Sequence, residues 1–324
     1  MVNVVITGVT GFIGSHLAKR LVELSYRVFG LTRPCASRSL EPIKDILDDI
    51  VLLTGDITEF FSISNVLKTV DPDYVCHLAA LTPVRLSFEK PFDYERTNYL
   101  GTMNIIHAMM ELPDYKERKL IFASTPEVYG FQTNGKPLSE DACFKPISPY
   151  AVSKAAADMY IRMACRVYDL NAVILRPANT YGRRFEKGFM AEYLVTSMLK
   201  KERVYVGAPE SIREYLYVTD HVNAYIQAIE RGTRGEAYNI GTGSGIKNRY
   251  LAEKIAEKAG YDVNKIVFGA YPPDYPLRPI ASDQPYIILD STKAKRELNW
   301  SPQVDLDEGL KKTINYWKSK LAIR

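Results

Sequence analysis

A tyrosine and a lysine stand four residues apart at the start of a long helical pattern. They are Tyr150 and Lys154, in the segment SPYAVSK at residues 148–154. Residues i and i+4 share one face of a helix, so both side chains can reach the same pocket. A free phenol has a pKa near ~10 and is a poor base at neutral pH, but a neighbouring ammonium favours the phenolate. The spacing therefore indicates that Tyr150 is a general base.

A glycine-rich turn near the N-terminus predicts a binding site for a dinucleotide cofactor. Residues 7–14 read TGVTGFIG, between an apolar strand and a helical pattern, and their GxxGxxG spacing departs from the GxGxxG of dehydrogenases. Glycine lets the backbone approach a pyrophosphate, and the helix start adds free N–H groups and partial positive charge. An oxidised nicotinamide would also favour the Tyr150 phenolate. The residues expected to line this site are Gly8, Thr10, Gly11, Phe12, Ile13 and Gly14.

The end of the second predicted strand bears on which dinucleotide is bound. Folds that prefer NAD place an acid there for the ribose hydroxyls, but residues 29–33 read FGLTR. Thr32 and Arg33, with Ser37 and Arg38 nearby, suit a 2′-phosphate through charge-assisted hydrogen bonds. NADP is therefore favoured, and NAD stays the alternative if Arg33 is a solvated loop arginine.

Two further strand ends are expected to complete the dinucleotide site. Asp56 and Ile57 follow the third strand and could hold the adenine edge by a carboxylate hydrogen bond and an apolar contact. Leu78, Ala79 and Ala80 end the fourth strand with mostly small residues, as a wall close to the cofactor requires.

The elements that must position these residues alternate along the first half of the 324-residue chain. Strands are predicted at 4–6, 27–31, 50–53, 74–78, 119–123 and 172–176, with helices at 13–24 and 62–69. This alternation predicts an α/β fold with a doubly wound parallel sheet, which binds ligands at the carboxyl ends of its strands. The second half is rich in Pro and Gly and predicts a smaller domain, with helices near 190–200, 220–231, 250–259 and 306–318.

Composition excludes several other classes of protein. Hydrophobic residues make up 46% and charged residues 25%, which is ordinary globular composition. Lys and Arg number 42 and Asp and Glu 38, and the net +4 is too small to predict nucleic-acid binding. No apolar run approaches ~18 residues, and the start MVNVVITG lacks a signal-peptide pattern. We expect a cytoplasmic protein with four reduced cysteines and, because its histidines lack ligand spacing, no metal.

Seven motifs together resemble the extended short-chain dehydrogenase/reductases that epimerise or dehydrate nucleotide sugars. TGVTGFIG, GDIT, HLAA, STPEVYG, SPYAVSK, LRPANTYG and REYLYVTDH occur in that family's order. The resemblance implies a Rossmann domain over 1–178, to which segments near 212–240 return, and a nucleotide-sugar domain over 179–211 and 241–324. It also implies a homodimer or homotetramer, in which helices around 97–110 and 151–168 pair.

The resemblance further implies a Thr-Tyr-Lys set formed by Thr125, Tyr150 and Lys154. Lys154 would bind the nicotinamide ribose, and Thr125 would hydrogen-bond the sugar O4. Tyr150 would take the proton from the C4 hydroxyl while C4 gives its hydride to NAD(P)⁺. The ketone so formed acidifies the neighbouring C5–H bond.

Glu127 decides which reaction follows in this interpretation. In 4,6-dehydratases a glutamate at this position abstracts the C5 proton, water leaves from C6, and hydride returns to C6. The dTDP-glucose enzymes also have an acid where this chain has Pro126, whereas GDP-mannose-type enzymes lack it, so a GDP-mannose-like 4,6-dehydratase is favoured. A 4-epimerase needs no C5 base and is the alternative. A reductase, a decarboxylase or a cofactor-sensing protein are the remaining ones.

The substrate diphosphate is expected to meet arginines of the second half. A guanidinium matches phosphate geometry with two parallel hydrogen bonds. The resemblance implies contacts to the nucleotide from Arg213 and Arg278, and to the sugar phosphate region from Asn179. Arg184 is a further candidate, with Arg183 as its alternative in register.

Overall fold

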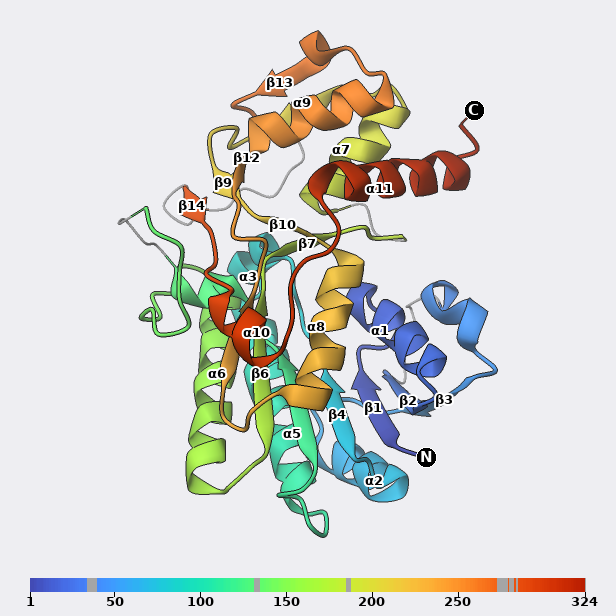
Figure 1. Ribbon diagram of the computed structural model, residues 1–324, viewed down its shortest axis with the longest axis vertical. Coiled ribbons are helices and arrows are strands. Elements are labelled where there is room, and N and C mark those ends of the chain that lie inside the picture. Colours follow the sequence, from blue (N-terminus) through green and yellow to red (C-terminus); the bar gives the residue numbers. More distant parts are fainter. Residues whose placement is uncertain are drawn as a thin grey trace.

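A parallel sheet forms the centre of the larger lobe in the computed structural model (Figure 1). The structure describes residues 1–33, 40–130, 135–184, 188–272, 279, 283 and 285–323. Within them the sheet has seven strands, in the spatial order β11 (Ala237–Ile240), β6 (Ala172–Pro177), β5 (Lys119–Ala123), β4 (Tyr74–His77), β1 (Asn3–Thr7), β2 (Arg27–Thr32) and β3 (Ile50–Thr54). The strand order reverses between β1 and β4, the place where doubly wound folds bind ligands.

Helices cover both faces of this sheet, as predicted. On one face lie α1 (Phe12–Glu23) and α8 (Val218–Arg231), and on the other α2 (Phe60–Val70), α5 (Gly101–Met110) and α6 (Pro149–Val167). Successive strand residues point to opposite faces, so Val4 and Ile6 pack beneath α1 and α8 while Val5 packs beneath α2, α5 and α6. Strands buried on both faces explain the continuous apolar runs in the sequence.

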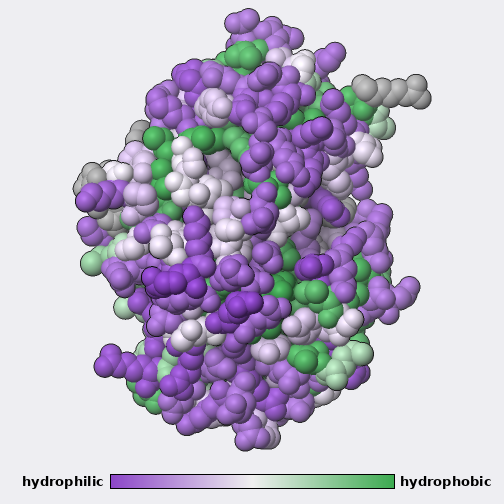
Figure 2. All heavy atoms as spheres, in the orientation of Figure 1, coloured by the Kyte–Doolittle hydropathy of each residue, from purple (hydrophilic) through white to green (hydrophobic). Residues whose placement is uncertain are grey.

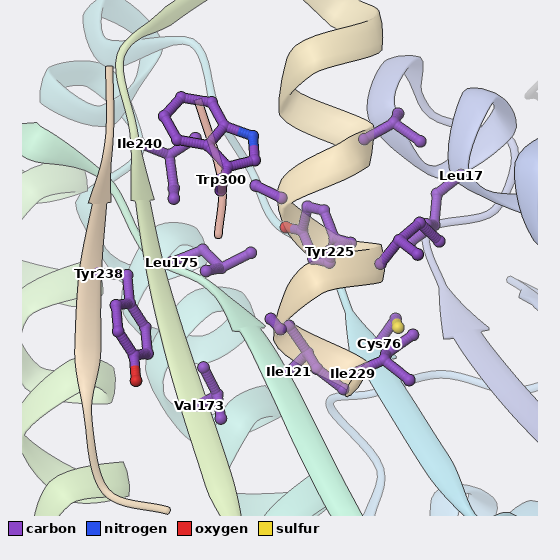
Figure 3. Packing of buried hydrophobic residues seen from close by; sticks show 14 of the residues in the cluster. Leu17, Cys76, Ile121, Val173, Leu175, Tyr225, Ile229, Tyr238, Ile240 and Trp300 are labelled. Atoms are coloured by element: carbon purple, nitrogen blue, oxygen red, sulfur yellow. The ribbon is translucent and has the colours of Figure 1, made fainter. Parts of the chain in front are cut away.

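The core beneath α8 is filled by large side chains. Figure 3 shows Tyr225 and Ile229 of α8 turned toward Ile121 and Leu175 of the sheet. Trp300 is fully buried in the same cluster, and its indole N–H donates to the Asp220 carbonyl at 2.9 Å. A residue far along the chain therefore helps to fix α8 against the sheet.

A smaller lobe is built almost entirely from the second half of the chain (Figure 1). Its helices are α7 (Met190–Leu199), α9 (Asn248–Ala259) and α11 (Leu306–Lys320). Its strands pair as β7 (Asn179–Tyr181) with β10 (Tyr215–Tyr217), β8 (Val204–Val206) with β13 (Ile266–Phe268), and β12 (Ile246–Lys247) and β14 (Tyr286–Ile287) on either side of β9 (Ile212–Arg213). Figure 2 shows that the face seen in Figure 1 is mostly hydrophilic.

Short helical segments connect these elements. They are η1 (Glu41–Ile46), α3 (Val84–Glu89), α4 (Pro91–Tyr94), the π-helical turn η2 (Glu95–Leu100), η3 (Pro126–Tyr129), η4 (Val263–Lys265) and α10 (Thr292–Glu297). Across the described parts of the chain, no helix is both long and apolar enough to cross a bilayer.

Candidate active site

Only glycine fits at two positions of the segment that joins β1 to α1, one in the turn and one in the first turn of the helix. Gly8 has φ +75°, and a Cβ there would lie 2.9 Å from the backbone nitrogen of Ala79. A Cβ on Gly14 would lie 2.2 Å from the Gly8 carbonyl oxygen. Gly11 precedes α1 without a side-chain cap, and the first turn of α1 carries no acidic residue. The N–H groups at the start of α1 are therefore available to bind an anion. Together with the glycine turn they form a cradle that fits a dinucleotide pyrophosphate.

The other residues predicted for this cradle lie around the same turn. Thr10, Phe12 and Ile13 are half-buried in the turn and the first turn of α1. Leu78 and Ala80 are half-buried at the end of β4, next to Ala79, whose backbone nearly touches Gly8. The structure therefore brings the ends of β1 and β4 together, as their pairing in the sheet requires.

Thr32 and Arg33, which were predicted to contact the cofactor, lie at the end of β2. The Thr32 hydroxyl donates to the Leu53 carbonyl at 3.3 Å, and Arg33 is exposed. The nearby Ser37 and Arg38 lie outside the described residues.

Asp56 and Ile57 are held by local contacts. The Asp56 carboxylate accepts hydrogen bonds from the Thr58 N–H and hydroxyl, both at 2.9 Å. Ile57 is 5% exposed and packs against Gly101, where a Cβ would lie 2.9 Å from the Ile57 side chain. Half of the Asp56 side chain's acceptor capacity is thus already committed to shaping its own turn.

The start of α6 positions the tyrosine–lysine pair. Ser148 caps the helix by accepting a hydrogen bond from the Ala151 N–H at 3.1 Å, and Pro149 occupies the first helical position, where its missing N–H costs nothing. Tyr150 is 9% exposed and Lys154 3%. The Lys154 ammonium lies 4.1 Å from the ring centre of Phe122 on β5.

Burial governs the acid–base state of this pair. It raises the pKa of Tyr150 well above its ordinary value, and the nearby Glu127 and Tyr94 raise this pKa further, while a hydrogen bond with Thr125 lowers it. Burial also lowers the pKa of Lys154 to about 7, against the opposing effect of Asp158. The protein by itself therefore keeps Tyr150 protonated at neutral pH.

Thr125 and Glu127 approach Tyr150 from the end of β5. Thr125 adopts φ −158° and ψ 152°, the extended conformation expected for a residue that precedes proline. Its hydroxyl oxygen accepts a hydrogen bond from the Glu127 N–H at 3.3 Å. Glu127 is half-buried, and its carboxyl is close enough to raise the Tyr150 pKa. At the carboxyl end of β5, the Thr125 hydroxyl therefore forms a hydrogen bond with the Tyr150 phenol, and the charge of the Glu127 carboxyl acts on the same phenol.

A buried ion pair braces α6 behind this point. The Asp158 carboxylate receives two hydrogen bonds from the Arg176 guanidinium, at 2.9 and 3.0 Å, and one from the Ser124 hydroxyl at 2.7 Å. Asp158 and Arg176 are fully buried, so Arg176 is a scaffold residue. Asp158 was not predicted from the sequence as part of the site, although its spacing four residues after Lys154 puts it on the same helix face.

Tyr94 was also missed as a neighbour of the site. Its ring lies edge-on to that of Tyr150, with centres 6.3 Å apart, and its hydroxyl donates to the Pro83 carbonyl at 2.5 Å. No local pattern distinguishes it from the many other tyrosines of the chain. Its position depends on how α4 folds back against α6.

The predicted substrate residues contact different elements. Arg213 lies on β9, 3.6 Å from the Asp283 carboxylate. Asn179 is exposed on β7, paired in register with Tyr215. Arg184 is exposed and its guanidinium lies 5.8 Å from the ring centre of Tyr316 on α11.

The alternative to Arg184 has a different environment. The Arg183 guanidinium lies between two rings, 4.4 Å from the centre of Phe12 and 3.5 Å from that of Phe189. Its side chain is 13% exposed. Arg278 falls outside the described residues. Among the residues that are described, no group of three or more His, Cys, Asp and Glu side chains could hold a metal ion.

A doubly wound sheet with a glycine cradle at its first turn and a Tyr-Lys pair on one helix face defines a short-chain dehydrogenase/reductase. The family described as GDP-mannose 4,6 dehydratase matches residues 5–313. The chain belongs to the extended branch that contains the nucleotide-sugar 4,6-dehydratases and 4-epimerases. It is therefore an NAD(P)-dependent enzyme of this kind.

Relatives of both reaction types cover nearly the whole chain. A UDP-glucose 4-epimerase of Mycolicibacterium smegmatis is 31% identical over 97% of this chain and 98% of its own length. The structure of the Thermotoga maritima UDP-glucose 4-epimerase with UDP-glucose superimposes with a TM-score of 0.88 at 33% identity, covering 98% of this chain and 99% of the other. That of a Streptomyces venezuelae dTDP-glucose 4,6-dehydratase, with NAD and TYD bound, gives 0.88 at 26% identity, covering 99% and 98%.

Proposed function

We propose that the protein is a 4,6-dehydratase of a nucleotide-diphosphate hexose, of the GDP-mannose type. The observation that carries the proposal is the half-buried carboxyl of Glu127 beside Tyr150 and Thr125. A 4,6-dehydration needs two proton acceptors near the sugar, one for the C4 hydroxyl and one for C5. Tyr150 and Glu127 supply both from neighbouring elements.

Each of these residues has a distinct role in the proposed reaction. When bound, the nicotinamide accepts a hydride and later returns it, and its positive charge in the oxidised form favours the phenolate. Tyr150 takes the C4 hydroxyl proton, Thr125 orients O4, and Lys154 binds the nicotinamide ribose. Glu127 takes the proton from C5 and gives it to the hydroxyl that leaves C6 as water, because Pro126 has no titratable group for that step. C5 takes up one proton again when C6 is reduced, and this balances the proton that Tyr150 removed from the C4 hydroxyl.

A 4-epimerase is the second candidate. The observation in its favour is the 33% identity to the Thermotoga maritima UDP-glucose 4-epimerase over nearly the full length of both chains. In that reaction the hydride returns to the opposite face of C4, and Glu127 takes no part.

Mass spectrometry of the product separates the two candidates. The protein is incubated in turn with GDP-mannose, dTDP-glucose, UDP-glucose and UDP-N-acetylglucosamine. We expect one of them, GDP-mannose first, to lose the mass of one water. An unchanged mass with a new chromatographic peak would instead establish epimerisation, and would identify the nucleotide at the same time.

We further propose that NADP is the preferred cofactor, because β2 ends in Thr32 and the exposed Arg33 rather than in an acid. The change Arg33→Ala should weaken NADP binding about 10- to 100-fold, the effect of losing one charged hydrogen bond, and NAD binding much less. Fluorescence titration of both dinucleotides measures this. Arg231→Ala removes an exposed arginine at the C-terminal end of α8, which has no part in the proposed site, and is the matched control. Equal weakening of both dinucleotides would discard the 2′-phosphate assignment.

We also propose that the chain forms a homodimer through α4, η2 and α6. Four apolar side chains of these elements are strongly exposed: Phe92 by 85%, Met159 by 57%, Leu100 by 47% and Val152 by 44%. Apolar side chains gathered on neighbouring elements mark a surface that another protein covers.

The change Met159→Asp should convert such a dimer into a monomer. An unpaired carboxylate buried in an apolar interface is costly, so the dimer dissociation constant should rise by roughly 100-fold or more. Light scattering after size exclusion measures the change in mass. Tyr250→Asp, on α9 of the smaller lobe, should leave the dimer intact, since Tyr250 is also exposed but lies elsewhere. A monomeric unaltered protein would contradict the proposal.

A further inference from the structure

A row of buried polar side chains connects the dinucleotide cradle with the catalytic helix. Its members are Thr7 on β1, His77 on β4, Asn98 in η2, Thr102 on α5 and Ser153 on α6. None is more than 2% exposed. Buried polar atoms need hydrogen-bond partners, so the direction of each bond in this row can be worked out by counting donors and acceptors.

The hydrogen-bond partners of Thr7 determine the direction of its bond with His77. Its hydroxyl oxygen accepts hydrogen bonds from the Ala79 N–H at 3.0 Å and from the Leu78 N–H at 3.1 Å, and the Leu78 N–H is shared with the Thr7 carbonyl at 3.3 Å. These occupy both of its lone pairs, so the hydroxyl hydrogen must point at the remaining neighbour, Nδ1 of His77, 2.7 Å away. Nδ1 therefore accepts and carries no proton.

The hydrogen-bond partners of Thr102 determine the protonation of Nε2, the other ring nitrogen of His77. The Thr102 hydroxyl donates to the Asn98 carbonyl at 2.6 Å, one turn earlier in the helix. Its oxygen lies 3.1 Å from Nε2 of His77 and accepts a hydrogen bond from it. The ring is therefore the neutral tautomer with its proton on Nε2. In agreement, burial lowers the pKa of His77 to about 3, and the charge of Lys154 adds to this effect.

Asn98 connects these hydrogen bonds to Tyr150 through Ser153. Its amide N–H groups donate to the Leu81 carbonyl at 3.0 Å and to the Ser153 hydroxyl at 3.1 Å, and its oxygen accepts from the Leu81 N–H at 2.8 Å. The Ser153 hydroxyl in turn donates to the Tyr150 carbonyl at 2.8 Å. One continuous set of bonds thus joins the turn at Gly8 to the backbone of the catalytic tyrosine.

We propose that His77 is a positioning residue, which as the neutral Nε2–H tautomer holds the dinucleotide cradle and the start of α6 at a fixed separation. The imidazole is the only member of the row that links β4 both to β1 and to α5. A shift of this ring would move the cradle relative to Tyr150, and hydride transfer is sensitive to misplacements on the order of 1 Å. The kinetic consequence rests on the proposed function of Tyr150, but the tautomer does not.

The tautomer is tested by ¹⁵N NMR of protein labelled at its histidines, without any substrate. The His77 resonances are assigned by their loss in His77→Gln or, if that variant does not fold, His77→Asn. We expect an unprotonated Nδ1 and a protonated Nε2, with shifts that stay constant from about pH 8 to about pH 5, where an ordinary histidine titrates. A ring protonated on Nδ1, or one that titrates in this range, would overturn the inference.

The positioning role is tested at Thr102, which touches His77 but lies away from the reacting atoms. Thr102→Val removes the acceptor for Nε2–H and should lower kcat by roughly 10- to 100-fold with little change in KM, whereas Thr102→Ser should restore most of the loss. The rate measured is that of whichever sugar reaction the enzyme performs, so the outcome does not depend on dehydration.

The matched control is Thr313→Val. Thr313 is 2% exposed on α11, and its hydroxyl donates to the Gly309 carbonyl one turn earlier at 2.8 Å, as Thr102 does to Asn98. Both valine variants should lower the melting temperature to a similar extent, but only Thr102→Val should lower kcat. Equal kcat values for the two variants would show that the row serves folding alone.

Discussion

Replacing Tyr150 by phenylalanine should lower turnover by roughly 10²- to 10⁴-fold, the usual contribution of a general base, and leave the dinucleotide bound. The phenol oxygen is the group that takes the C4 hydroxyl proton in the proposed reaction. The ring itself should stay in place, because it packs edge-on against Tyr94. Steady-state kcat, together with the dinucleotide content of the purified protein, measures both effects.

A second tyrosine of the same helix provides the control for this variant. The Tyr160 hydroxyl lies 2.7 Å from Nε2 of His107, away from Thr125 and Glu127. Tyr160→Phe therefore removes one hydroxyl from α6 without touching the proposed chemistry, and its kcat should match that of the unaltered protein. Full activity of Tyr150→Phe would refute the role of Tyr150 as the base.

Glu127→Gln should abolish dehydration, by roughly 10²- to 10⁴-fold, while the 4-ketone still forms. The amide keeps the shape of the side chain but cannot take a proton from C5. Absorbance of the reduced dinucleotide in a single turnover reports C4 oxidation, and mass spectrometry reports the loss of water. The two readouts together separate the C5 step from the Tyr150 step.

Glu140→Gln is the matched control for the charge change. Glu140 is also half-buried, but its carboxylate accepts a hydrogen bond from the Asn239 N–H at 2.8 Å, which the amide oxygen of glutamine can accept equally. Its dehydration rate should be close to normal. If Glu127→Gln dehydrates at the normal rate, the C5 base lies elsewhere, and if it epimerises at the normal rate, the enzyme is a 4-epimerase.

The fold was predictable where local pattern and burial agree. The second strand was expected over 27–31 and is found at Arg27–Thr32, and the helix expected over 13–24 is Phe12–Glu23. Segments near 212–240 were expected to return to the sheet domain, but β11 was not predicted as a strand, because it has only four residues and one of them is the polar Asn239. The Asn239 amide is buried and donates to the Leu138 carbonyl at 2.8 Å, a partner that only the folded chain supplies.

Some residues of the candidate site could likewise be predicted from the sequence, and others could not. Gly8, Gly14 and the pair Tyr150 and Lys154 are set by spacing within one turn or one helix, so the sequence reveals them. The roles of His77 and Asn98 depend on partners on other elements: Thr102 lies 25 positions after His77, and Ser153 lies 55 positions after Asn98. No spacing within a single element encodes such contacts, and they became visible only with the packed sheet.

The position of β11 in the sheet also has a consequence for protein synthesis. β6 ends at Pro177, but its outer neighbour β11 ends at Ile240, after much of the smaller lobe has been made. At ~5–20 residues per second, a ribosome needs roughly 3–13 s to add that stretch. During this time the nascent sheet exposes the hydrogen-bonding edge of β6, which is the kind of edge that pairs with strands of other chains. Slow translation or a pause within residues 178–236 would therefore prolong the period in which newly made molecules are most prone to aggregate.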